Sequence, residues 1–195
     1  MKMHSLKPFL FAFAAALFAL CSLATDARSQ RRDFVNDQEA ELIREYQEID
    51  RRIEVLMKFI DRRLAAAGIP GHNWTVPKNI ELWGEEPKGA RHELLYDVKR
   101  ILQKAVDDID DIASRETSAI EGNEKSGKLF PKAVRNLASG ANRFKPIFQA
   151  ELAKTTNEKE KGVLYDSIEL CDQIVEAAAN LPKEPTKEEK KKTKN

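Results

Sequence analysis

Apolar residues recur at intervals of three and four in four stretches of this chain. This spacing places them along one side of an α-helix, where they form a stripe that must be buried against other elements. Four such stripes predict an all-α protein with an up-down-up-down four-helix bundle. The stripes consist of Leu42, Tyr46, Ile49, Ile53, Leu56 and Ile60; Leu95, Val98, Leu102, Ala105, Ile109 and Ile112; Phe130, Val134, Leu137, Ala141, Phe144 and Phe148; and Leu164, Ile168, Cys171, Val175 and Ala178.

Prolines, glycines and capping residues set the expected ends of these helices. Pro146 lies inside the third helix and is expected to kink it, because its ring removes a backbone hydrogen bond and clashes with the preceding turn. Asn157, followed three residues later by Glu160, resembles a capping box at the start of the fourth helix. The expected helices span residues 33–67, from 87 or 89 to 121, 131–154 and 157–181.

Charged residues indicate how the helices are stabilised. Arg62 and Arg63 lie near the C-terminus of the first helix, where positive charge is favourable to the helix dipole. The second helix carries a dense acidic cluster and the third is mainly basic, so antiparallel packing of these two helices would match their charges. The basic residues of the third helix are Lys132, Arg135, Arg143, Lys145 and Lys154.

Residues 69–86 interrupt the helical pattern between the first two helices. They include prolines and glycines, yet also both tryptophans of the chain, Trp74 and Trp83. Such a connection is long for a bundle, in which about two to eight residues suffice. The tryptophans have two interpretations: they cover the open end of the bundle, or they contact a ligand or partner.

The N-terminal segment, residues 1–27, has the three-part layout of a secretory signal peptide with cleavage after Ala24 or Ala27. We therefore expect an exported protein, periplasmic or secreted, whose bundle domain spans residues 28–182. The alternative is an inner-membrane anchor formed by residues 8–24, a stretch slightly shorter than the ~20 residues of a membrane span.

Removal of the signal changes both the charge and the cysteine content. Cleavage at the first site removes Lys2 and Lys7 from 33 basic residues and leaves 32 acidic residues, so the net charge becomes −1. This balance does not favour nucleic acid as a partner. Cys21 is also lost, and Cys171, the remaining cysteine, is expected to be a buried apolar residue.

Residues 183–195 are rich in lysine and lack apolar side chains, which predicts a disordered tail that solubilises the chain or touches anionic lipid.

Helical bundles often hold haem or paired metal ions, but the corresponding motifs are missing. The sequence has no Cys-x-x-Cys-His, no Glu-x-x-His and no His-Glu-x-x-His, so we expect no cofactor and no catalytic residue. One acidic cluster could supply ligands to a cation such as Ca²⁺, although its spacing distributes the side chains around the helix and favours a solvated face. This cluster consists of Asp107, Asp108, Asp110 and Asp111.

These features favour a non-enzymatic exported bundle that works through contacts, as a scaffold, adaptor or binding module. Its partner is an unknown protein or envelope component, and Trp74 and Trp83 are the candidate contact residues. Membrane contact is expected only if the N-terminal segment is uncleaved or the lysine-rich tail touches lipid. The alternative is a bundle that carries a small apolar molecule or a metal. The space for it would be opened by Gly140, Ala141 and the kink at Pro146, beside Phe144 and Phe148.

Overall fold

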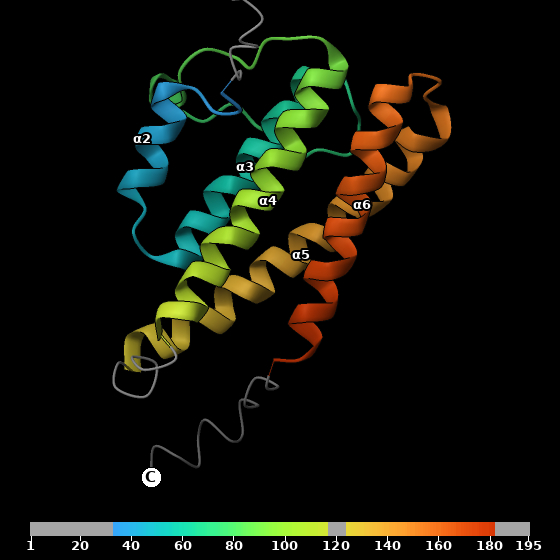
Figure 1. The fold of residues 1–195 in the computed structure, drawn as a ribbon. Coiled ribbons are helices and arrows are strands. Elements are labelled where there is room, and N and C mark those ends of the chain that lie inside the picture. The colour runs from blue at the N-terminus through green and yellow to red at the C-terminus, as the bar shows by residue number, and fades with distance from the viewer. Residues whose placement is uncertain (1–32, 117–123, 182–195) are drawn as a thin grey trace, which may run out of the picture. The chain divides into compact units, whose positions relative to one another are not determined.

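The computed structural model describes residues 33–116 and 124–181, and these two ranges contain five α-helices and no β-strand (Figure 1). The predicted all-α class is therefore confirmed for the described residues. The helices lie in one compact unit that begins at Phe34. The predicted signal peptide, lysine-rich tail and final residues of the second helix lie outside the described residues. The elements are α2 (Asp37–Glu45), α3 (Ile49–Ala66), the 3₁₀ helix η1 (Ile80–Trp83), α4 (Arg91–Glu116), α5 (Glu124–Lys154) and α6 (Glu158–Ala179).

The first predicted helix, residues 33–67, is wrong as a single element. It is divided into α2 and α3 by Tyr46 and the two residues after it, and α2 turns back so that Glu39 meets the C-terminal end of α3 (Figure 1). No glycine or proline marks the break. Folding back buries Leu42 and brings a carboxylate to two buried arginines, and such tertiary contacts outweigh local helix propensity.

The middle two helices form where the stripes predict, with shifted starts. α4 begins at Arg91 rather than at residue 87 or 89. α5 begins at Glu124, ahead of the predicted start at Pro131, and Pro131 and Pro146 both lie inside this continuous 31-residue helix. Each proline removes one backbone hydrogen bond without ending the helix.

The start of α6 agrees with the sequence only in part. Asn157 is the N-cap residue, and its side chain accepts a hydrogen bond from the backbone N–H of Lys159 at 3.0 Å. Glu160 does not complete the predicted capping box. Its carboxylate instead accepts hydrogen bonds from Arg91 and from the hydroxyl of Thr155. The residue that would have capped α6 thus joins it to α4.

The four long helices contact one another in the order α3, α4, α6, α5, and α5 also contacts α3. Ion pairs show that α3 and α5 run parallel: Asp50 pairs with Lys132, and Asp61 pairs with Arg143 at 2.7 Å. Both pairs join residues that are 82 positions apart, as does the contact between Glu54 and Asn136. The constant separation means that the two helices advance together.

The predicted charge match between the second and third helices is wrong. Lys132 and Arg143 of α5 pair with acids of α3 instead. One ion pair between α4 and α5 has the opposite polarity, since Arg91 belongs to α4 and Glu151 to α5, at 2.5 Å. Helices that are consecutive in sequence need not share their largest contacts, and α4 and α5 contact each other far less than α3 and α5 do.

The apolar stripes meet in one buried core. Phe59 and Phe144 are fully buried, and Phe148 stacks on Phe144 with ring centroids 6.1 Å apart. Burial of a large side chain of this kind contributes about 1.5–3 kcal/mol. Cys171 is buried in the same core, as expected, and this burial raises the pKa of its thiol to about 12. None of the helices in the described ranges is both long and apolar enough to cross a membrane.

Candidate functional site

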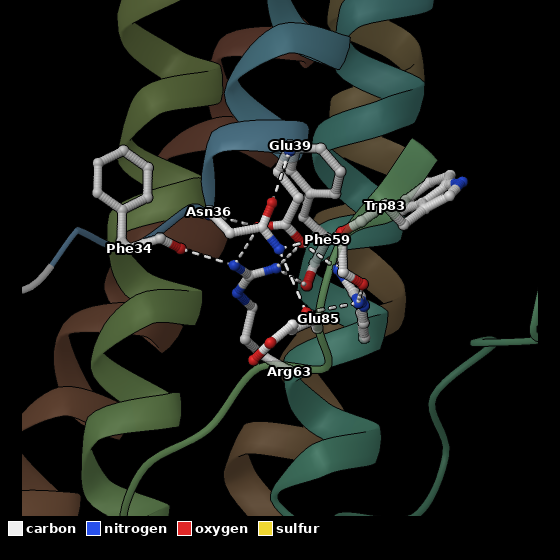
Figure 2. Close-up of polar contacts among 9 residues, drawn as sticks. Phe34, Asn36, Glu39, Phe59, Arg63, Trp83 and Glu85 are labelled. Carbon is white, nitrogen blue, oxygen red and sulfur yellow. Dashed lines mark hydrogen bonds and ion pairs between the residues drawn. The ribbon is translucent and has the colours of Figure 1, made fainter. Parts of the chain in front are cut away.

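A cluster of buried charges joins α2 to the last turns of α3. Glu39 is 0% exposed, and Arg62 and Arg63 are each 3% exposed. Arg63 binds both carboxylate oxygens of Glu39, with Nη1 donating to Oε1 at 2.6 Å, and Arg62 Nη1 donates to the same oxygen at 2.9 Å. Figure 2 shows Glu39 and Arg63 converging beneath the first turn of α2. We call Glu39, Arg62 and Arg63 the arginine clamp.

The clamp also binds the backbone of a distant segment. Arg62 donates to the carbonyl oxygen of Trp83 at 2.6 Å and to those of Gly84 and Glu85 at 2.8 Å each. Asn36, the N-cap residue of α2, donates from its side chain to the carbonyls of Trp83 at 3.0 Å and Glu85 at 3.2 Å (Figure 2). Three consecutive carbonyl groups are therefore fixed by side chains from α2 and α3.

Two guanidinium groups and one carboxylate leave an excess of one positive charge in this buried cluster. The backbone carbonyls share that charge, including the carbonyl of Phe34, which accepts from Arg63 Nη2 at 2.8 Å. A buried charge is tolerated when hydrogen bonds of this kind replace water. The arrangement commits every clamp residue to the fold, so we assign it a positioning role rather than a chemical one.

The segment held by the clamp belongs to the connection between α3 and α4, residues 67–90, which we call the tryptophan loop. Trp83 ends η1, is 7% exposed, and packs edge-on against Phe59 with ring centroids 5.5 Å apart. Trp74 is half-buried beside it at 5.1 Å, and the Arg62 guanidinium lies 5.6 Å from the Trp74 ring. Trp83 thus anchors the loop on the core, while Trp74 lies at the edge of that contact.

A second polar contact holds the loop near its beginning. The backbone N–H of Asn73 donates to Asp61 Oδ1 at 2.9 Å. Asp61 is buried and accepts two hydrogen bonds from Arg143 of α5, at 2.7 and 2.8 Å. The loop is consequently tied to α3 on both sides of η1.

Between these ties the loop presents apolar side chains to solvent. Val76 is 72% exposed, Leu82 48% and Ile80 38%. They are three of the five large apolar residues that the described part of the chain leaves exposed, and Tyr96 and Tyr165 are the others. The sequence shows that these loop residues are apolar, but their exposure depends on the backbone position that the arginine clamp and Trp83 fix.

The acidic cluster on α4 does not converge on one point. Asp108 pairs with Lys104 at 2.7 Å and lies 4.0 Å from Arg52. Asp107 accepts a hydrogen bond from Gln103 at 2.9 Å, while the other two aspartates, Asp110 and Asp111, are exposed. Within the described residues, no group of three or more His, Cys, Asp or Glu residues is arranged to hold a metal ion.

Met57 packs closely against Gly140. A Cβ atom on Gly140 would lie 2.5 Å from the Met57 sulfur and 3.6 Å from the Phe144 ring. The glycine therefore allows α3 and α5 to approach each other, with the Met57 side chain against the α5 backbone.

Comparisons with protein families, curated proteins and solved structures found no match. The main functional feature of the described residues is therefore a loop with outward apolar side chains whose backbone is held by buried charges.

Proposed function

We propose that this protein is a non-enzymatic exported helical protein that binds a protein or envelope partner through the tryptophan loop. The observation that carries the proposal is the exposure of Val76, Ile80 and Leu82 on a loop tied at both ends to α3. Apolar side chains on a preorganised backbone are suited to binding, because little conformational freedom is lost when a partner docks.

The non-enzymatic part of the proposal draws on the use of the buried charges. Glu39, Asp61 and Glu151 each accept hydrogen bonds from arginines inside the fold. Such groups stabilise the fold and are buried away from solvent. The carrier alternative gains no support from the contact between Met57 and Gly140 described above.

We also propose that α3, α4, α5 and α6 form an up-down-up-down four-helix bundle in which α3 and α5 are neighbours. The constant separation of ion-paired residues supports parallel α3 and α5, and the pairs Arg91–Glu160 and Lys99–Asp166 support parallel α4 and α6. Cysteines replacing Glu54 and Asn136 should cross-link on oxidation; failure to do so would contradict this neighbour relation.

The binding proposal is tested with the double variant Ile80→Asp, Leu82→Asp. Capture of partners from an envelope extract should fall at least about tenfold, since charged groups cannot enter an apolar interface without cost. The matched control is Tyr165→Asp on α6, whose side chain is 62% exposed and lies outside the loop. Both proteins should keep the wild-type melting temperature within a few degrees, because the replaced side chains contact solvent.

The same assay distinguishes a tryptophan that covers the end of the bundle from one that contacts a ligand or partner. Trp83→Ala should destabilise the protein by about 3–5 kcal/mol, the cost of removing a large buried aromatic. Trp74→Ala should weaken capture with a smaller loss of stability. Equal capture by wild type, loop variant and Tyr165→Asp would overturn the assignment of the loop as the binding surface.

Export is tested by N-terminal sequencing of the protein recovered from its host. Cleavage at the proposed sites gives a chain that begins at Thr25 or Arg28. An intact N-terminus in the membrane fraction would instead support the anchor alternative.

A further inference from the structure

A shallow groove between α3 and α5 has a methionine as part of its lining. The groove has a volume of about 340 Å³ and opens to solvent, and its lining includes Glu54, Met57, Asn136, Ser139 and Gly140. This volume is about ten times the ~30 Å³ that one water molecule occupies in the liquid. A small oxidant such as hydrogen peroxide can therefore enter it.

Contact with α5 restricts where an added oxygen could go. Met57 is 8% exposed, and a Cβ atom on Gly140 would lie 2.5 Å from its sulfur. The side of the sulfur that faces Gly140 is thus occupied by the α5 backbone. Met57 also lines the groove, together with the amide of Asn136 and the hydroxyl of Ser139, so we infer that an added oxygen is accommodated on the groove side.

We propose that Met57 is a sulfoxidation site that peroxide-class oxidants reach in the folded protein. A sulfur lone pair attacks one peroxide oxygen, the O–O bond breaks, and the other oxygen leaves as water after proton transfer. The sulfur loses two electrons and the peroxide gains them. The product is a polar, chiral sulfoxide at the contact between α3 and α5, which weakens their packing.

The second sulfur of the described residues has a contrasting environment. Cys171 is 0% exposed, and burial raises the pKa of its thiol to about 12. Peroxide reacts with the thiolate form, which is scarce at neutral pH under these conditions. Oxidation of the folded protein should consequently reach Met57 before Cys171.

The test is peroxide treatment of the native protein followed by peptide mapping. The peptide containing Met57 should gain one oxygen atom, at a rate within about a hundredfold of that in denaturant, because the reaction requires no global unfolding. Oxidised protein should melt about 3–6 °C below untreated protein. The matched control, Met57→Leu, conserves volume and should show no peroxide-dependent loss of melting temperature.

Two results would overturn the proposal. One is a native rate of Met57 oxidation more than about a hundredfold below the rate in denaturant, which would mean that the sulfur reacts only after unfolding. The other is an equal loss of melting temperature in wild type and Met57→Leu, which would place the damage elsewhere. Neither result bears on partner binding by the tryptophan loop, so the two proposals fail independently.

Discussion

Ion pairs hold α3 at both of its ends, but in different surroundings. At the C-terminal end, Glu39, Arg62 and Arg63 are all buried. At the N-terminal end, Asp50 is buried, while the side chain of its partner Lys132 is 52% exposed. Water can replace Lys132, but it cannot enter the arginine clamp without opening the fold. The two ends therefore allow the contributions of a buried and a half-exposed ion pair to the free energy of unfolding to be compared within one helix.

The two ends also differ in what they position. The pair Asp50–Lys132 joins two helices that already share apolar contacts. The arginine clamp instead fixes α2 and the backbone of residues 83–85, segments with few buried side chains of their own. Buried polar contacts thus determine structure where the apolar core does not reach, and that part of the molecule carries the proposed binding loop.

The largest expected effect is that of Glu39→Gln. This change leaves two buried guanidinium groups without their carboxylate and should lower the free energy of unfolding by about 3–5 kcal/mol. The control is Glu41→Gln on the same helix, whose carboxylate is 69% exposed beside Arg44 and should contribute no more than about 0.5 kcal/mol. Chemical denaturation monitored by circular dichroism measures both.

A double variant sharpens this comparison. Glu39→Gln combined with Arg63→Gln removes one charge of each sign, so its stability loss should be smaller than the sum of the two single losses. Strictly additive losses, or a Glu39→Gln effect as small as that of Glu41→Gln, would show that the clamp does not couple these residues.

The sequence predicted the parts of the fold that depend on apolar periodicity. The stripes place Ile53, Leu102, Phe144 and Cys171 in the core, and all four are buried. Periodicity reports that a face is buried, but not which neighbour covers it. The pairing of α3 with α5 could therefore not be read from the stripes, and the predicted charge match between the second and third helices was wrong.

The clamp was missed because its residues fit a simpler explanation. Arg62 and Arg63 near a helix C-terminus satisfy the helix dipole, and that interpretation requires no partner. Two features of the sequence indicate a different arrangement. Arg63 falls three residues after Ile60 in the apolar stripe, and Asn36 with Glu39 has the spacing of a capping box. The first feature indicates a buried charge, and the second indicates a helix start within the supposed single helix.

An intermediate effect is expected for Gly84→Ala, which tests the fit between the tryptophan loop and α2. Gly84 has φ of +66°, and a Cβ atom there would lie 2.6 Å from the Gln38 side chain and 3.0 Å from Asn36 Nδ2. The strained backbone and the displaced side chains should together cost about 1–3 kcal/mol.

The control for this change is Gly162→Ala in α6. Apart from its chain neighbours and the backbone of its own helix, no atom lies within 4 Å of the added Cβ. The residue is helical, so alanine should stabilise the protein by about 0.5–1 kcal/mol. Opposite signs for the two glycine variants in one thermal denaturation series would support the loop geometry. A neutral Gly84→Ala would show that residues 83–85 are not held as described.

The smallest expected effect concerns Lys132 and is recognisable by its pH dependence. Burial alone would raise the pKa of Asp50, but the hydrogen bond and charge of Lys132, together with Arg51, lower it below the ordinary value of 3.8. A carboxyl group whose pKa is lowered on folding adds stability above its unfolded pKa and loses that contribution as the pH falls through the folded pKa. Lys132→Gln should therefore lower stability only slightly at neutral pH, by less than any other change predicted here. The difference from wild type should shrink below about pH 4, as Asp50 becomes protonated in both proteins. A difference that is constant from neutral to acidic pH would mean that Lys132 acts through packing, and the contrast between the two ends of α3 would then no longer be one of charge.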